Sequence, residues 1–248
     1  MEKNAENLKV EKDVEESKNQ SLLDYMPEEP SLAQWGHDQT ILDLVRESRT
    51  KATECIKLLE GGGWKDAGEI EGVKGFTQNL NNNHKTRAVK VRFEVAASID
   101  TILDIIRDPK SFETFQTSAY DGRIIEKVND DLQFERHAIS MHILLLNRDF
   151  CLVSYRIKFT NGNQGVMIFS CPHDQFPAAW LSKRAELTLF VYLKKLDQNK
   201  TRANIYLTVN MCGLLSYFFI DNQLRDELHE FILFRRFIEA RAGNDNAL

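Results

Sequence analysis

His137, Tyr155 and Arg156 have side chains of the types that move protons or bind charge, and they lie in one part of the chain. An acid–base group acts only when it lies within about 3 Å of the proton that it transfers. The sequence does not show that these three side chains converge on one point. They leave an enzyme open as one alternative, with these three residues as its candidates.

Other signs of catalysis or metal binding are weak. The sequence contains no nucleophile elbow, Walker loop, dinucleotide-binding fingerprint or paired zinc cysteines. His137 and His142 are five residues apart on one predicted strand or at its end, so they point to opposite faces and make a poor metal pair. We therefore expect no metal, no other cofactor and no catalytic activity.

The charge of the chain is concentrated near its N-terminus. The net charge is −5, and residues 1–30 hold nine acidic and four basic side chains, whereas the rest holds 28 of each. A nucleic-acid-binding protein needs a basic surface that displaces counterions from phosphates. The neutral folded part therefore argues against a nucleic-acid partner.

The cysteines and the apolar segments predict where the protein works. Cys55, Cys151, Cys171 and Cys212 lie far apart, and no hydrophobic signal segment precedes them, so we expect a reducing, cytoplasmic location. The richest apolar segment, residues 212–220, is shorter than the roughly 20 residues that cross a bilayer. We therefore predict no transmembrane helix.

The first 60 residues divide into two parts. Residues 1–37 are rich in Glu, Lys and Asn and poor in large apolar side chains, which predicts a disordered acidic tail. Residues 38–60 have apolar side chains at helical spacing before the sequence GGGW, so we predict an amphipathic helix that ends at Gly61.

Three short strand-like segments follow, of which RAVKVRFEV alternates apolar and charged side chains most regularly. Ser98 then caps a short predicted helix, and Asp108-Pro109 stops it because the residue before proline disfavours helical geometry. Six further strand-like segments, separated by turn signals, predict an antiparallel meander. The chain ends in a predicted helix over residues 214–241.

These elements predict the fold class. Short loops between consecutive strands give antiparallel pairing, and the long final helix must bury its apolar stripe against a curved sheet. We predict an α+β helix-grip fold, in which a curved antiparallel sheet of about nine strands wraps around the C-terminal helix, with an N-terminal helix and a short inserted helix. One domain is expected over residues 38–248, with its core at residues 64–241.

In its order of motifs, the stretch from Trp64 to about Arg241 resembles the START lipid-transfer family. The anchors are Trp64, VAASIDTILDIIRDP, GRIIEKV, NRDF at residues 147–150, Pro177, and Gly213-Leu214-Leu215 at the start of the last helix. The chain departs from the family pattern at two places. A tryptophan that often follows the first inner helix is replaced by Phe112 or Phe115, and no proline follows Gly213 closely.

The resemblance implies a non-enzymatic carrier that moves one lipid, a phospholipid or a sterol, between membranes. The lipid would lie in an internal hydrophobic tunnel gated by the loop over residues 171–183 and the C-terminal helix. The expected contact with membranes is transient, and we expect a monomer. Arg148 and Asp149 would fix the loop and the strand register, although a simple surface ion pair between them is an equal alternative.

The resemblance also implies which residues touch the lipid. In family members that hold phospholipid or sterol, an arginine six positions beyond the arginine of RDF points into the tunnel, and here that position is Ser154. Arg156 could replace it, with Glu135 and Arg136 as neighbours; alternatively, Arg156 and Arg136 face water. The predicted lipid-binding residues are Glu135, Arg136, Ala138, Leu152, Ser154, Arg156, Leu189, Phe218, Leu224 and Leu228.

The loop CPHDQFPAAWLSK is a predicted membrane contact. It would expose Phe176, Trp180 and Leu181, which could enter a bilayer interface while the tunnel opens. The alternative is that Trp180 packs back on the last helix. Two rival functions remain open, a helix-grip enzyme of the polyketide cyclase or aromatase type, and an interaction module without cargo.

Overall fold

The computed structural model describes residues 38–80, 86–141, 146–177, 182–212 and 223–245. The predicted acidic tail lies outside these residues. The helices are α2 (Gln39–Glu60), α3 (Ile99–Ile106), α4 (Pro109–Phe115) and α5 (Gln223–Asp245). The strands are β1 (Lys65–Ile70), β2 (Val73–Leu80), β3 (Thr86–Val95), β4 (Ala119–Lys127), β5 (Leu132–Ile139), β6 (Asn147–Lys158), β7 (Gln164–Ser170), β8 (Ser182–Arg184), β9 (Glu186–Asp197) and β10 (Lys200–Asn210).

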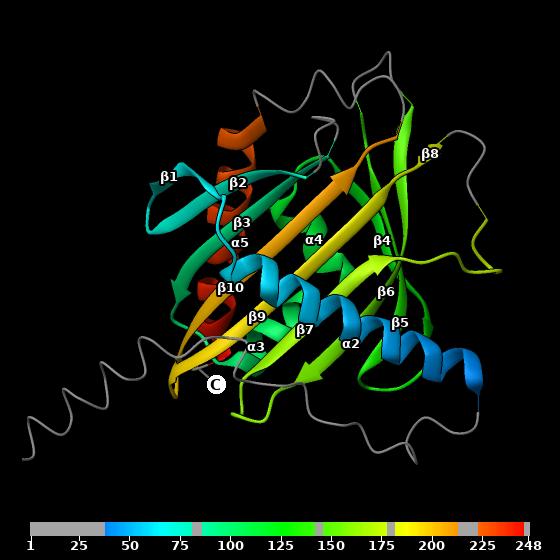
Figure 1. Ribbon diagram of the computed structural model, residues 1–248, viewed down its shortest axis with the longest axis horizontal. Coiled ribbons are helices and arrows are strands. Elements are labelled where there is room, and N and C mark those ends of the chain that lie inside the picture. Colours follow the sequence, from blue (N-terminus) through cyan, green and yellow to red (C-terminus); the bar gives the residue numbers. More distant parts are fainter. Residues whose placement is uncertain (1–37, 81–85, 142–145, 178–181, 213–222, 246–248) are drawn as a thin grey trace, which may run out of the picture.

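The strands form one sheet in the order β1-β2-β3-β10-β9-β7-β6-β5-β4. All neighbours on this path are antiparallel, and the short β8 adds a parallel pairing with the start of β6. The predicted α+β helix-grip fold is confirmed (Figure 1). Figure 1 shows α2 crossing one face of the sheet, which we call the outer face, and α3, α4 and α5 on the other, which we call the inner face.

The local sequence explains where the helices begin. The Asp38 carboxylate accepts hydrogen bonds from the backbone N–H groups of Thr40 and Ile41 at the start of α2, at 2.8 and 3.4 Å. Ser98 caps α3 in the same way, and Pro109 occupies the first turn of α4, where it loses no helical hydrogen bond. The predicted helices at 38–60 and after Ser98 are therefore confirmed.

The final helix differs from its prediction at its C-terminal end. It continues to Asp245 instead of ending at Arg241, because no proline stops it and Ala242 is buried against the inner core. Residues 214–222 of the predicted helix lie outside the described residues. Within the described ranges, no helix combines the length and the apolar composition that crossing a bilayer requires.

Each face of the sheet has its own hydrophobic core. The outer core joins α2, through residues such as Cys55, Ile56 and Leu59, to the tyrosine and phenylalanine side chains of β6 to β10. The inner core joins the sheet to α3 and α5. Helix α5 comes close to β2, since a Cβ atom at Gly75 would lie only 2.5 Å from Cδ2 of Leu228, so a larger residue there would require Leu228 to shift.

Candidate functional site

The strand register aligns the inward-facing side chains into rows that cross the sheet from β5 to β10. We call the first two the upper row and the middle row. The upper row is Glu135, Leu152, Ser170, Leu187 and Val209. The middle row is Gln133, Ser154, Ile168, Leu189 and Leu207. Since neighbouring strands lie about 4.8 Å apart, each row extends roughly 19 Å across the sheet.

A third row, which we call the lower row, belongs to a closed core. Its apolar members are fully or almost fully buried: Val166, Val191, Ile205 and Val91. Helix α3 contacts β7 and β9, and the buried side chains of α3 and of the C-terminal part of α5 belong to the same core. This end of the inner face is filled by protein.

The upper and middle rows are not closed in this way at their β9 and β10 ends. Leu187, Leu189, Leu207 and Val209 pack against the inner core but stay only partly buried, as does Met211 just beyond β10. Fully burying one such side chain contributes about 1.5–3 kcal/mol, so leaving several partly exposed is unfavourable. These five residues form what we call the open apolar wall.

The β5 and β6 ends of the same rows are buried and, apart from Leu152, polar. Glu135 is 0% exposed, and its Oε1 accepts a hydrogen bond from Gln133 Nε2 at 2.8 Å. His137 Nε2 lies 2.9 Å from Glu135 Oε2, and the Phe112 ring of α4 packs edge-on against the imidazole. Ser154 is also 0% exposed. We call Gln133, Glu135, His137 and Ser154 the polar cluster.

Arg107, at the end of α3, borders the polar cluster from the side of the closed core. It donates to the carbonyl oxygen of Asp130 and to Gln133 Oε1, the latter at 3.4 Å, while Gln133 Nε2 donates to the Arg107 carbonyl at 2.8 Å. Burial lowers the pKa of Arg107, and the nearby Glu135 carboxylate partly opposes that shift. The polar cluster is thus fixed to the helix layer.

Arg148 and Asp149, at the start of β6, bind separate neighbouring segments. Arg148 is buried, and its Nε donates to the carbonyl of Met211 at 2.6 Å, with a further bond to Cys212 at 3.4 Å. Asp149 points to the outer face and accepts from Arg184 of β8 at 2.9 Å. The two side chains therefore fix neighbouring segments, as the resemblance implied, instead of forming a surface ion pair with each other.

The structure brings six of the predicted lipid-binding residues, Arg156 among them, onto the inner face, but not to one end of it. Glu135, Leu152, Ser154 and Leu189 lie in the upper and middle rows. Leu228 lies in the inner core, 2% exposed. Phe218 lies outside the described residues, and so does the side chain of Leu224.

Two predicted residues require correction because successive side chains of a strand point to opposite faces. Arg136 pairs with Cys151 and Ala138 with Asp149, so both lie on the outer face. Arg136 forms an ion pair with Asp121 at 2.5 Å there. Neither residue can share the inner face with Glu135.

Arg156 faces inward in the lower row, two residues beyond Ser154 on β6, but its guanidinium binds residues outside the polar cluster. Its guanidinium binds Gln164 at 2.6 Å and Asp100, at the start of α3, at 3.1 Å. Tyr155 belongs to the outer core, and His137 pairs with Phe150, about 20 Å along β6 from Arg156. The three residues named for an enzyme therefore do not meet.

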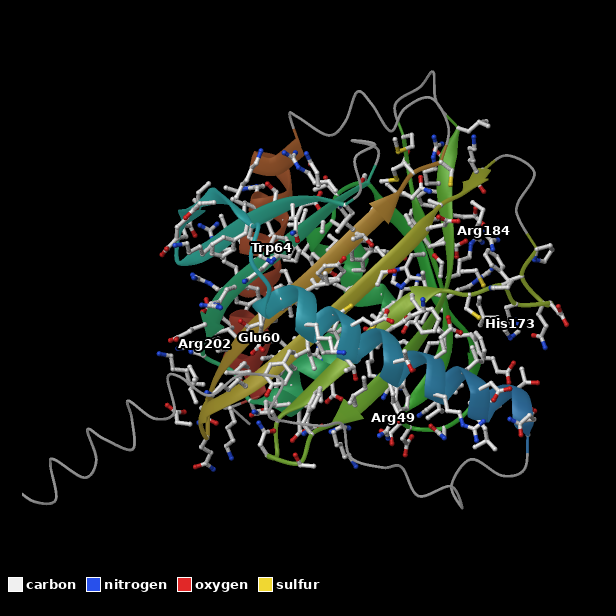
Figure 2. All side chains as sticks on the ribbon, in the orientation of Figure 1. Arg49, Glu60, Trp64, His173, Arg184 and Arg202 are labelled. Carbon is white, nitrogen blue, oxygen red and sulfur yellow. The ribbon has the colours of Figure 1, made fainter. Side chains whose placement is uncertain are left out.

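The predicted membrane contact is described only in part. The Phe176 side chain is 9% exposed, with its ring 4.6 Å from Arg136 Cζ and 5.0 Å from Arg184 Cζ. Figure 2 shows Arg184 at the edge of the sheet where β8 lies. Phe176 is thus held between two cations and is not an exposed loop side chain. Trp180 and Leu181 lie outside the described residues.

The predicted lipid-binding residues did not include Gln133, His137, Leu187, Leu207 and Val209, and the sequence named His137 only as an enzyme candidate. The signal that could have found the first two is the alternation of LQFERHAI, in which Gln133, Glu135 and His137 share one face. The apolar three belong to regular alternating strands, where nothing in the sequence separates an open position from a closed one.

No protein-family model matches the sequence, and no curated protein does. Solved structures share the fold. Human StAR-related lipid transfer protein 5 superimposes with a TM-score of 0.71 at 14% identity, over 83% of this chain and 99% of that one.

Human STARD10 gives a TM-score of 0.66 at 14% identity, over 81% of this chain and 79% of that one. A STAR-related lipid transfer protein fragment from Xanthomonas axonopodis gives 0.62 at 17% identity, over 71% and 99%. These three structures, from two organisms, thus share the fold described above. This chain has the START-like helix-grip fold.

Proposed function

We propose that this protein binds one lipid molecule on the inner face of its sheet and transfers it between membranes without chemical change. The observation that carries this proposal is the pairing of two surfaces in the same rows. The open apolar wall lies at one end, and the polar cluster lies at the other. A molecule with a polar end and a long apolar body would complete both.

The energetics favour a lipid as that molecule. Each methylene moved from water onto an apolar surface contributes about 0.8 kcal/mol, so one acyl chain or a body of similar size binds without specific contacts. The open apolar wall offers Leu187, Leu189, Leu207 and Val209 on adjacent strands. Two of the structures named above, human StAR-related lipid transfer protein 5 and the Xanthomonas axonopodis fragment, are lipid transfer proteins by name, which supports the same assignment.

Two measurements test the proposal. Mass spectrometry of the protein, purified natively and then denatured, should release lipid in about a one-to-one ratio. Purified protein should also move a fluorescent lipid from donor to acceptor vesicles faster than the spontaneous rate. Release of a chemically altered product instead of an intact lipid would favour an enzyme. A stable protein that never takes up lipid would favour a cargo-free interaction module.

A further inference from the structure

The carboxylate of Glu135 is buried with capacity for further hydrogen bonds. A carboxylate has about four acceptor sites, and the protein occupies two of them, through Gln133 Nε2 and His137 Nε2. Removing a charge from water is unfavourable unless its hydrogen-bonding capacity is used. Glu135 can therefore still accept a proton donor from a bound molecule.

Ser154 provides a second and independent sign of a missing partner. Its side chain is fully buried, it stands directly opposite Gln133 in the strand register, and its Oγ has no hydrogen-bond partner among the described residues. Buried polar atoms without partners are uncommon in folded proteins, and a buried hydroxyl without a partner can bind a water molecule or a ligand. Ser154 lies on the same face of the sheet as Glu135, since both point inward on neighbouring strands.

The arginines around the inner face have protein acceptors, although the buried Nε of Arg107 has no partner among the described residues. Arg148 binds the carbonyls of Met211 and Cys212, and Arg156 binds Gln164 and Asp100. Arg107 donates to Gln133 and to the carbonyl of Asp130. A phosphate group needs charge-assisted donors such as a guanidinium fork. On the inner face, Ser154 has Gln133 directly opposite it, and the Glu135 carboxylate lies one row away.

Resting on the proposed function, we infer that the bound lipid has an uncharged polar end with a hydroxyl or amide hydrogen, and that phosphodiester lipids are rejected. The donor hydrogen of this end binds a free acceptor site of Glu135, and its oxygen accepts the Ser154 hydroxyl hydrogen. The apolar body then follows the middle row towards Leu189 and Leu207. A phosphodiester would bring a second negative charge beside Glu135, where the nearby Arg107 guanidinium already donates to Gln133 and to the Asp130 carbonyl.

The first test compares lipids on the unmodified full chain. Vesicles of phosphatidylcholine contain equal mole fractions of cholesterol, diacylglycerol and ceramide, and the lipid extracted by the protein is identified by mass spectrometry. The three neutral lipids separate the possible sources of the hydroxyl or amide. Extraction of one or more of them, with phosphatidylcholine left behind, is the expected result.

The other outcomes of this test are distinct. Extraction of phosphatidylcholine as efficiently as the neutral lipids would overturn the inference while leaving the proposed function intact. If no lipid is extracted from vesicles of any composition, the proposed function fails and the inference fails with it.

Two variants test the residues. Ser154→Ala should weaken extraction of the preferred neutral lipid about tenfold, because one hydrogen bond in a buried site is lost, yet should leave the lipid-free stability unchanged. Glu135→Gln keeps the shape and removes the charge, so it should raise the share of phosphatidylcholine in the extracted lipid. An unchanged head-group preference in both variants would overturn the inference.

Ser48→Ala is the matched control. Ser48 is as fully buried as Ser154, but it lies on α2 against the outer face, where its hydroxyl donates to the Leu44 carbonyl at 2.7 Å. This variant should leave lipid selectivity at the unmodified value. Equal effects of Ser48→Ala and Ser154→Ala on extraction would assign the loss to general destabilisation and would also overturn the inference.

Discussion

The two faces of the sheet differ in burial even between consecutive residues of one strand. On β9, Phe190 points to the outer face and is 0% exposed, whereas Leu189 beside it points inward and stays partly buried. On β10, Tyr206 and Leu207 repeat the same contrast. Adjacent residues of the same strand therefore have different surroundings, although all are large and apolar or aromatic.

The difference comes from what covers each face. Helix α2 crosses the outer face and contacts β6, β7 and β10, so its apolar side chains close that core (Figure 1). On the inner face, α3 contacts β7 and β9 and α5 contacts β1 to β3, and their core includes the lower row. A protein can thus build one face for stability and leave part of the other for a ligand.

The largest test of this contrast removes a ring from the closed face. Phe190→Ala should lower the free energy of unfolding by about 3–5 kcal/mol, because it leaves a cavity in the outer core. Leu189→Ala, its inward neighbour, should cost clearly less, since the leucine side chain is only partly buried. Urea denaturation of both variants gives the two values, and equal costs would contradict the contrast.

A smaller effect on stability is expected at Arg148, which connects β6 to the residues that follow β10. Arg148→Met should lower the free energy of unfolding by about 1.5–3 kcal/mol, because hydrogen bonds from a charged group to the Met211 and Cys212 carbonyls are lost. The matched control is Arg123→Met, whose guanidinium is mostly exposed and pairs with Asp121 at 3.8 Å. Chemical denaturation should leave the control near the unmodified value; a neutral Arg148→Met would mean that these bonds do not stabilise that connection.

Enlarging a side chain should lower stability on the outer face but mainly block lipid uptake on the inner face. Phe190→Trp adds volume to a filled core, so it should cost about 1–3 kcal/mol of stability through overpacking. Leu189→Trp adds volume beside the open apolar wall, so it should cost less than about 1 kcal/mol but should block lipid uptake. Thermal unfolding and vesicle extraction, measured on both variants, separate the two results. A Leu189→Trp protein that still takes up lipid normally would place the ligand elsewhere.

The order of elements could be predicted from the sequence because it depends on local signals. Asp38, Ser98 and Asp108 cap helices wherever the chain goes next, and RAVKVRFEV alternates as a strand must. The same local reasoning placed Glu135 and Arg136 in one site, although alternation along β5 separates them. The fold therefore followed from short-range patterns, while the site did not.

The open apolar wall could not be predicted for a different reason. Ile205 and Leu207 lie on the same face of β10, two residues apart, and only their distance from the covering helices makes one buried and the other partly exposed. That distance depends on where α3 and α5 pass over the sheet, which is a property of the whole fold. Likewise, the polar cluster depends on the register that sets Ser154 opposite Gln133.

The smallest expected effect is a loss of stability at alkaline pH, which should arise on the outer face. Burial raises the pKa of Tyr206 to about 12, with a further increase from the neighbouring Cys55, whose own pKa burial raises to about 12. A group whose pKa is higher in the folded state stabilises the fold below its unfolded pKa and loses that contribution as the pH rises towards the folded value. For Tyr206 the loss should extend from about pH 10 to about pH 12, and for Cys55 it should begin near pH 9.

Tyr206→Phe should therefore reduce the drop in denaturation midpoint between about pH 8 and about pH 11, whereas Leu207→Ala on the inner face should leave that drop unchanged. If Tyr206→Phe loses stability with pH as steeply as the unmodified protein, the dry packing of α2 over the outer face is not what sets the alkaline limit.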